Sequence, residues 1–148
     1  MDMKHDMDII KIQGGISQDH RGQVKYINDF DMSEIRRFYR IKNDSIDLVR
    51  GWRGHKMERR WFHTISGTFV IDIVKIDDWS SPSPLQPIVR YVLDAESTEV
   101  LCVPKGYATA IKAELEDSEI LVFSDFGITN ADNDNYFWDL DHFKNRES

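Results

Sequence analysis

The amino-acid sequence predicts an all-β fold, a sandwich or barrel of short strands. About nine or ten stretches carry the alternating or β-branched pattern that is typical of strands. Turn-forming residues separate these stretches roughly every 8 to 12 positions, and no long amphipathic helical pattern occurs. The chain has 148 residues, of which 41% are hydrophobic and 30% charged, and this is enough to bury one core. We therefore expect a single domain over residues 1–148.

Turn residues mark the boundaries of the expected strands. Gly14 and Gly15 end the first strand, and residues 19–22 (DHRG) form a turn before the second. Segment 77–87 carries three prolines and three serines and is expected to be a loop. The expected strands span residues 9–12, 23–27, 35–41, 49–56, 59–65, 68–76, 88–93, 100–103, 107–114 and 119–124. Near the C-terminus, 127–135 fits a polar loop and 136–143 fits either a strand or a closing helix.

The two-residue period of a strand assigns side chains to faces. In 35–41, one face carries Ile35, Arg37, Tyr39 and Ile41, and the other carries Arg36, Phe38 and Arg40. In 59–65, one face carries Arg60, Phe62 and Thr64, and the other carries Trp61, His63 and Ile65.

Composition excludes several classes of protein. A net charge of -7 argues against nonspecific binding to nucleic acid or to an anionic membrane. No apolar run is long enough to span a bilayer, and the N-terminus does not have the pattern of a signal peptide. The single cysteine, Cys102, lies in an apolar run and fits a buried, inert thiol. We expect a cytoplasmic protein that does not bind nucleic acid or membranes.

Residues 35–67 concentrate basic, aromatic and histidine side chains in this acidic chain. A local cluster of arginines favours a discrete anion site over a long polyanion track. The seven arginines of this stretch are Arg36, Arg37, Arg40, Arg50, Arg53, Arg59 and Arg60.

Seven segments occur in an order and spacing that match known motifs. They are 19–22 (DHRG), 34–39 (EIRRFY), 49–51 (VRG), 65–69 (ISGTF), 79–83 (WSSPS), 103–107 (VPKGY) and 136–143 (YFWDLDHF). On these segments the chain resembles the small cupins that act on nucleotide-linked sugars. Two groups are similar, the dTDP-4-keto-6-deoxyglucose 3,4-ketoisomerases and the dTDP-4-dehydrorhamnose 3,5-epimerases. The resemblance implies a cupin-type double-stranded β-helix, a jelly-roll barrel, with its core at about 19–143.

The chain departs from both groups at positions that matter for chemistry. Arg53 stands where both carry a proton-transferring histidine, while His55 matches the second histidine of the ketoisomerase motif H-A-H-K. Thr109 stands where both groups usually have histidine. Arg60 stands where a ketoisomerase has glutamine and an epimerase has lysine. Phe123 and Phe126 fall near the position of the epimerase catalytic tyrosine.

The resemblance implies proton transfer next to the keto group of a dTDP-4-keto-6-deoxyhexose. Such chemistry needs a base that titrates near neutrality, which histidine provides, and a group that stabilises the enolate. Arginine stays charged and can stabilise an enolate or clamp a diphosphate. The candidate catalytic residues are His55, Tyr39 and Arg53, and the candidate substrate-binding residues are Arg37, Arg50, Arg60, Trp52 and Tyr107.

Structural roles compete with these assignments. His55 also fits a solvated loop residue beside Lys56, and Arg50 fits a salt bridge as well as a ligand contact. Arg37 and Tyr39 could instead lie on an outer face, and aromatic residues in a β core more often pack than bind. A second function is therefore a degenerate cupin that binds a sugar nucleotide or another anion without turnover.

We expect no metal and no cofactor. Cupin metal sites usually use two close histidines, a carboxylate and a distant histidine. Arg53 interrupts the pair and Thr109 removes the distant ligand. The resemblance implies a small nucleotide sugar as partner, a homodimer and a role in surface-polysaccharide biosynthesis.

Overall fold

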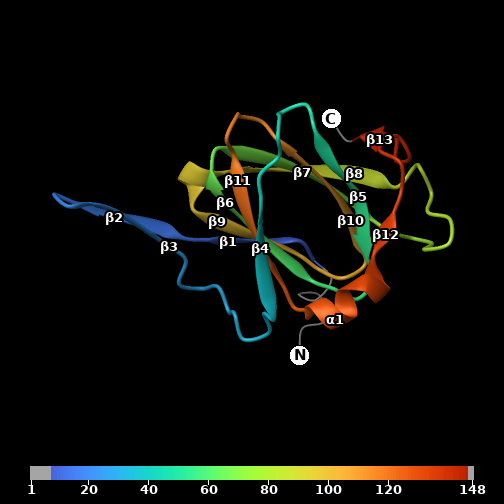
Figure 1. Cartoon of the computed structure of the whole chain (residues 1–148), viewed down its shortest axis with the longest axis horizontal. Helices are drawn as coiled ribbons and strands as arrows, with labels where there is room; N and C mark the ends of the chain where they lie inside the picture. Colours follow the sequence, from blue (N-terminus) through green and yellow to red (C-terminus); the bar gives the residue numbers. More distant parts are fainter. Residues whose placement is uncertain (1–7, 147–148) are drawn as a thin grey trace.

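The computed structural model describes residues 8–146, which form two facing β-sheets and a projecting hairpin (Figure 1). The strands are β1 (Ile10–Gln13), β2 (Gly15–Asp19), β3 (Gly22–Tyr26), β4 (Arg37–Ile41), β5 (Val49–His55), β6 (Arg60–Ser66), β7 (Thr68–Lys75), β8 (Pro87–Asp94), β9 (Glu99–Val103), β10 (Tyr107–Ala113), β11 (Glu119–Ser124), β12 (Tyr136–Phe137) and β13 (Asn145–Arg146). The helical elements are short, namely η1 (Ala95–Ser97), α1 (Ile128–Ala131) and η2 (Asp132–Asp134).

The strand order is that of a jelly roll. The five-stranded sheet runs β1-β9-β6-β11-β4, and the six-stranded sheet runs β12-β5-β10-β7-β8-β13. Neighbouring strands pair antiparallel, apart from β13, which runs parallel to β8. The all-β, cupin-type fold predicted from the sequence is confirmed.

The main core lies between the two sheets. Phe62, Leu101 and Ile120 from the five-stranded sheet meet Phe69 and Ile71 from the six-stranded sheet, and all are fully buried. Each comes from a strand in which every second side chain points inward. Burial of this apolar surface is the main force that holds the sheets together.

A second apolar cluster covers the outer face of the six-stranded sheet. Val74 and Ile88 contribute from the sheet, and Trp52, Trp138 and Phe143 pack against them. Strand β7 is therefore buried on both faces, which explains its nearly continuous apolar sequence.

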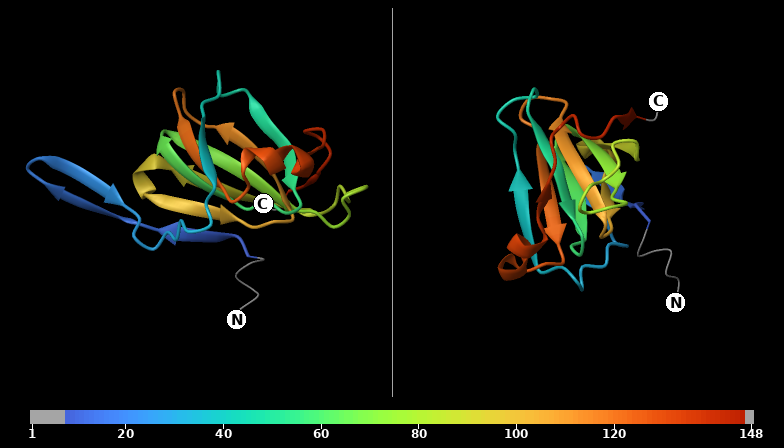
Figure 2. Two further views of the ribbon diagram at one scale, coloured as in Figure 1. Left: turned by 60° about the horizontal axis from the view of Figure 1, so that its bottom comes forward. Right: turned by 90° about the vertical axis from the view of Figure 1, so that its right-hand side faces the viewer.

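The hairpin of β2 and β3 extends away from the sandwich, at the left in Figure 2. The turn predicted at 19–22 closes this hairpin, but β2 was not expected. Its side chains are largely exposed, including the apolar Ile16, Val24 and Tyr26.

Most expected strands are present with shifts of one or two residues, and three segments differ. Residues 35 and 36 lie outside β4, which begins at Arg37. The expected loop 127–135 contains α1 and η2. In 136–143 only the first two residues are a strand, β12, because the rest folds over the outer apolar cluster. Strand β13 was not expected, and residues 1–7, 147 and 148 lie outside the described part of the chain.

The turn predicted at 66–67 has a clear physical basis. Gly67 has φ +70°, a conformation that side chains other than glycine rarely adopt. A Cβ there would also lie 1.9 Å from the Ser118 hydroxyl oxygen. The position requires glycine to connect β6 to β7.

No helix among residues 8–146 is long and apolar enough to cross a membrane.

Candidate active site

A cavity of about 580 Å³ lies between the sheets, beside the edge strands β4 and β12. Strands β5, β6 and β10 complete its wall. This volume is within the range of small-molecule sites. The lining residues are Tyr39, Arg40, Ile41, Lys42, Arg50, Gly51, Arg53, Arg60, Thr109, Ile111 and Phe137.

The lining carries five basic side chains and no acidic one. Two of these charges are paired, since Arg40 Nε lies 2.8 Å from Glu119 Oε2 and Lys42 Nζ lies 3.5 Å from Asp117 Oδ1. Among the side chains that the structure describes, the arginines at positions 50, 53 and 60 have no carboxylate within ion-pair distance. The cavity therefore presents three guanidinium charges that the described protein does not pair directly.

Neutral groups hold these three guanidiniums in place. Arg50 Nε donates to Asn43 Oδ1 at 2.7 Å, and Arg53 lies over the Phe137 ring, 5.2 Å from its centroid. Arg60 Nη2 donates to Thr109 Oγ1 at 2.8 Å. A hydroxyl, an amide and an aromatic ring orient the arginines and leave their charge available to a ligand.

Arg60 is the buried member of the set. It is only 4% exposed, whereas Arg50 and Arg53 are exposed. Burial lowers the pKa of Arg60, while Tyr39 and Glu58 act in the opposite direction. Arg60 forms the inner end of the cavity, and the exposed arginines stand nearer to solvent.

His55 lies two residues beyond Arg53 on β5 and is 4% exposed. Its Nδ1 is 2.9 Å from the carbonyl oxygen of Asp134 and 3.3 Å from Glu58 Oε1. Because a carbonyl only accepts hydrogen bonds, Nδ1 carries the proton and Nε2 keeps its lone pair. Nε2 is buried and has no hydrogen-bond partner among the described residues.

The surroundings keep His55 neutral. Burial lowers the pKa of His55 from 6.5 to about 3, and the positive charges of Arg60, Arg53 and Arg37 act in the same direction. The hydrogen bond to Asp134 opposes them. At neutral pH the ring is an unprotonated imidazole, not the solvated loop residue considered from the sequence.

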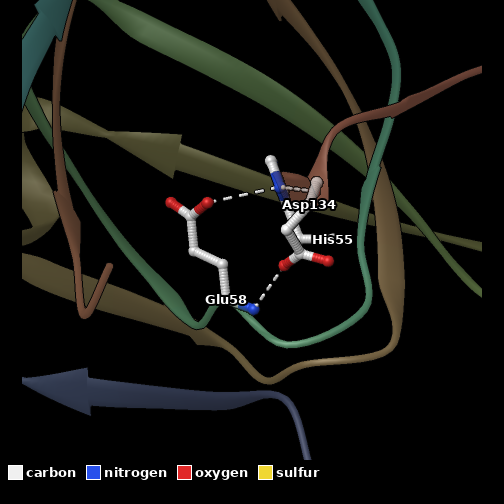
Figure 3. A group of neighbouring side chains, drawn as sticks. All are labelled: His55, Glu58 and Asp134. Carbon is white, nitrogen blue, oxygen red and sulfur yellow. Dashed lines mark hydrogen bonds and ion pairs between the residues drawn. The ribbon is translucent and has the colours of Figure 1, made fainter. Parts of the chain in front are cut away.

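The residues around His55 form a hydrogen-bonded framework (Figure 3). The Asp134 carboxylate accepts from the backbone N–H groups of Lys56, Met57 and Glu58 at 2.9, 2.9 and 2.8 Å. Glu58 Oε2 accepts from the Ser124 hydroxyl at 2.5 Å. The segment after β5 is thereby fixed to the residues that precede β12 and to β11.

His55, Glu58 and Asp134 place potential ligand atoms within 4.8 Å of one another, so we tested them as a metal site. Both Asp134 oxygens accept backbone N–H groups, and Arg37 Nη2 lies 3.5 Å from Glu58 Oε2. The Asp134 carboxylate is thus engaged by the backbone, and in this group only His55 Nε2 and Glu58 Oε1 have no hydrogen-bond partner in the described part of the chain. Two available ligand atoms beside a cation are fewer than a protein metal site uses. This donor set does not fit a metal centre, and the expectation of no metal stays a prediction.

The structure brings several predicted site residues together. Tyr39, Arg50, Arg53 and Arg60 line the cavity. Arg37 lies over the Tyr39 ring at 5.1 Å and also donates from Nε to the Phe126 carbonyl at 2.9 Å. The predicted inward face of 37–41 is correct, since Phe38 is 65% exposed.

Two predicted substrate-binding residues lie elsewhere. Trp52 is 1% exposed in the outer apolar cluster and donates its indole N–H to the Leu140 carbonyl at 3.2 Å. Tyr107 packs against the main core. Neither lines the cavity, and both pack as aromatic residues more often do in β structure. Their assignment to substrate binding stays a prediction that this cavity does not support.

The sequence patterns did not identify Glu58, Asp134 or Phe137. Glu58 could have been flagged, because it lies three residues after His55. Asp134 is 79 positions from His55, and its polar segment gave no sign of proximity. Phe137 faces the cavity because β12 pairs with β5, with Phe137 opposite Arg53.

Comparison with known proteins shows the fold. No protein-family model matches the chain, and a search of the curated proteins found no match. A sugar 3,4-ketoisomerase from Thermoanaerobacterium thermosaccharolyticum in complex with TDP superimposes with a TM-score of 0.67 at 18% identity, covering 86% of each chain. A 3,4-ketoisomerase from Helicobacter canadensis gives a TM-score of 0.69 at 18% identity, covering 93% of this chain and 95% of the other.

An epimerase has a similar structure. A 3'-monoepimerase from Streptomyces bikiniensis in complex with dTDP-quinovose gives a TM-score of 0.72 at 13% identity, covering 89% of this chain and 70% of the other. The resemblance expected from the sequence is thus confirmed in structure, since this chain shares its fold with ketoisomerases and epimerases of dTDP-linked sugars.

Proposed function

We propose that the protein is an isomerase or epimerase of a nucleotide-linked keto sugar and works by proton transfer next to the keto group. One observation carries this proposal. His55, a buried and neutral histidine with an unpaired Nε2, lies on β5 two residues after Arg53, and Arg53 is one of three guanidiniums without a described carboxylate partner that line the cavity. His55 itself is not among the lining residues. A base and an anion site are the two requirements of this chemistry.

The exposed arginines are suited to the diphosphate. Arg50 and Arg53 offer planar donors that match phosphate oxygens, and Phe137 adds an exposed aromatic surface beside Arg53. Solved relatives of the fold hold TDP or a dTDP-linked sugar. We infer that the nucleoside diphosphate lies at this end and the sugar at the inner end.

The chemical step needs only the residues at the inner end. His55 Nε2 takes a proton from the carbon next to the keto group, and the electron pair moves to the keto oxygen. Arg60 stabilises the resulting enolate. To give an isomer, the hydroxyl proton on the deprotonated carbon passes to the enolate oxygen and His55 returns its proton to the former carbonyl carbon, so that the keto group moves by one position. To give an epimer, a second group on the opposite face adds a proton to the same carbon, and His55 keeps the proton that it removed. Tyr39 lines the same cavity and would serve as the acid.

Solvent exchange tests the proposal. We would incubate the protein with dTDP-4-keto-6-deoxyglucose in deuterated water and follow the ring carbons by NMR. Deuterium at the carbon next to the keto group is the expected result. Tight binding of the sugar nucleotide with no deuterium at any ring carbon would overturn the enzymatic proposal.

A binding protein without turnover is the second candidate. Arg53 and Thr109 replace residues that act in the resembled enzymes, and a histidine of pKa about 3 is a weak base in the free protein. This function predicts thermal stabilisation by dTDP and dTDP-glucose without isotope exchange.

We further propose a homodimer and a cytoplasmic location. The exposed apolar side chains of the β2–β3 hairpin support the dimer, because a projecting two-stranded hairpin gains little stability alone. Light scattering of the intact chain and of a Val24→Lys variant tests it. A monomeric wild type at micromolar concentration would contradict the dimer.

A further inference from the structure

The arginines that line the cavity differ in burial from its exposed end to its inner end. Arg50 and Arg53 are exposed, whereas the Arg60 side chain is buried behind them with Thr109 as its hydrogen-bonding partner. A buried cation without a paired carboxylate is costly to keep in a free protein. A ligand anion at the inner end would offset that cost.

A diphosphate alone leaves part of this charge unmatched. Three lining guanidiniums lack a carboxylate partner among the side chains for which the structure gives a placement. A diphosphate that joins a nucleoside to a sugar carries two negative charges, which suit the two exposed arginines. The remaining guanidinium is that of Arg60, at the end assigned to the sugar.

Nearby carboxylates do not form an ion pair with Arg60, although Glu58 partly offsets the effect of burial on its pKa. Glu58 is 2% exposed, accepts from the Ser124 hydroxyl and pairs with Arg37 at 3.5 Å. Asp134 accepts three backbone N–H groups. The positive charge at the inner end also acts on His55, because Arg60 adds to the effect of burial in lowering the His55 pKa.

A neutral keto sugar leaves the charge of Arg60 unmatched until the enolate forms. Its enolate is a transient anion, and neutral donors such as hydroxyl and amide groups can stabilise one. A permanent carboxylate instead gives a buried guanidinium a bidentate partner in the bound state.

We propose, building on the nucleotide-sugar function above, that the preferred sugar bears a carboxylate that pairs with Arg60. The ligand class is a nucleoside-diphosphate-linked sugar acid, in which a carboxylate replaces the methyl group of a 6-deoxy sugar. Arg60 then determines specificity for this acid.

The test compares two ligands that differ in one group. Isothermal titration calorimetry at pH 7 would measure dTDP-glucuronate, dTDP-glucose and dTDP with the intact chain. The glucuronate is expected to bind at least about tenfold more tightly than the glucose ligand, in line with one charge-assisted, buried contact. Equal affinity, or tighter binding of the glucose ligand, would overturn the proposal.

Variants assign the preference to one side chain. Arg60→Met should remove the preference and leave the affinity for dTDP within about threefold, because the exposed arginines remain. Arg60→Lys keeps a charge without the planar fork and should keep part of the preference. Arg40→Met is the matched control, since this lining guanidinium already pairs with Glu119, and should keep the full preference. A preference that persists in Arg60→Met contradicts the assignment, and if that variant does not fold, the wild-type comparison and Arg60→Lys decide.

The result of this binding test can be distinguished from the result of the isotope-exchange test of the proposed function. A preference for glucuronate without isotope exchange on any keto sugar supports the ligand class and refutes the enzyme. Isotope exchange on a neutral keto sugar, together with equal affinities for dTDP-glucuronate and dTDP-glucose, supports the enzyme and refutes the ligand class. Failure to bind dTDP or either sugar nucleotide overturns both.

Discussion

Two sets of arginines in this sandwich differ in what balances their charge. On the outer face of the six-stranded sheet, Asp72 accepts from Arg90 at 2.8 and 3.1 Å and from Arg146 at 2.8 Å. In the cavity, Arg50, Arg53 and Arg60 contact an amide, an aromatic ring and a hydroxyl. We refer to these as the paired set and the cavity set.

The difference separates structural arginines from functional ones. The paired set ties β7, β8 and β13 together around one carboxylate that is 5% exposed. The cavity set leaves its charge for something outside the described protein. Both sets carry the same charge, and the groups that contact the guanidiniums distinguish them. The predictions below change one residue of these two environments at a time.

The largest effect is expected at the base that lies beside the cavity set. His55→Asn should slow deuterium exchange on a keto sugar by about 10² to 10⁴-fold, because general acid–base catalysis contributes this much. NMR measurement of the exchange rate tests it, with dTDP binding kept as evidence that the site is intact. His63→Asn, whose Nδ1 contacts the Glu99 carbonyl at 3.0 Å, is the control and should exchange at the wild-type rate. Unchanged exchange in His55→Asn would remove His55 from the mechanism.

A second effect is the pH dependence of stability. The folded pKa of His55 is about 3, below its ordinary 6.5, so the unfolded chain binds more protons between these values. Stability is therefore complete above pH 6.5 and falls as pH drops toward 3, by a few kcal/mol. Urea unfolding from pH 7.5 to 4.5 should show this slope, and His55→Asn should reduce it.

The paired set provides the contrast in pH dependence. Burial raises the pKa of Asp72, but its hydrogen bonds and ion pairs with Arg90 and Arg146 outweigh this effect and lower the pKa below its ordinary 3.8. Its contribution is present above that value and is lost only as pH falls further. An identical slope between pH 6.5 and 4.5 in wild type and His55→Asn would contradict the assignment to His55.

Removing one charge should change the stability of the free protein in opposite directions in the two sets. Asp72→Asn should lower the free energy of unfolding by about 1–3 kcal/mol, because two arginines lose their shared carboxylate. Arg60→Met should leave the stability of the free protein unchanged or raise it by up to about 2 kcal/mol, because a buried, poorly balanced charge is replaced by an apolar side chain. Denaturation of both variants without ligand measures the difference. A greater loss in Arg60→Met than in Asp72→Asn would show that Arg60 supports the fold.

The smallest effect concerns the aromatic partner of the cavity set. Phe137 is 65% exposed and lies under the Arg53 guanidinium. Phe137→Ala should weaken dTDP binding by about two- to fivefold, the range expected for an exposed cation–π contact. Phe38→Ala, which removes an equally exposed aromatic side chain from the outward face of β4, is the matched control and should bind dTDP as the wild type does.

Local patterns were sufficient for much of the fold. The two-residue period placed Arg37 and Tyr39 on the inward face of β4 and Arg60 with Phe62 and Thr64 on the inward face of β6. The same pattern did not reveal β2, which has few apolar residues and is held by hairpin pairing. It also did not place Trp52, because its face depends on which sheet face the C-terminal segment covers.

The sequence by itself determined the all-β fold, the inward arginine faces and the resemblance that pointed to a sugar-nucleotide site. These depend on neighbours along the chain, where side-chain period and turn residues act directly. Only the tertiary structure decided that Asp134 fixes the proton on His55 Nδ1 and that Arg60 bonds to Thr109 and forms no ion pair with a described carboxylate. Both depend on pairs of segments far apart in sequence, and burial then turns those contacts into a neutral base and an unpaired charge.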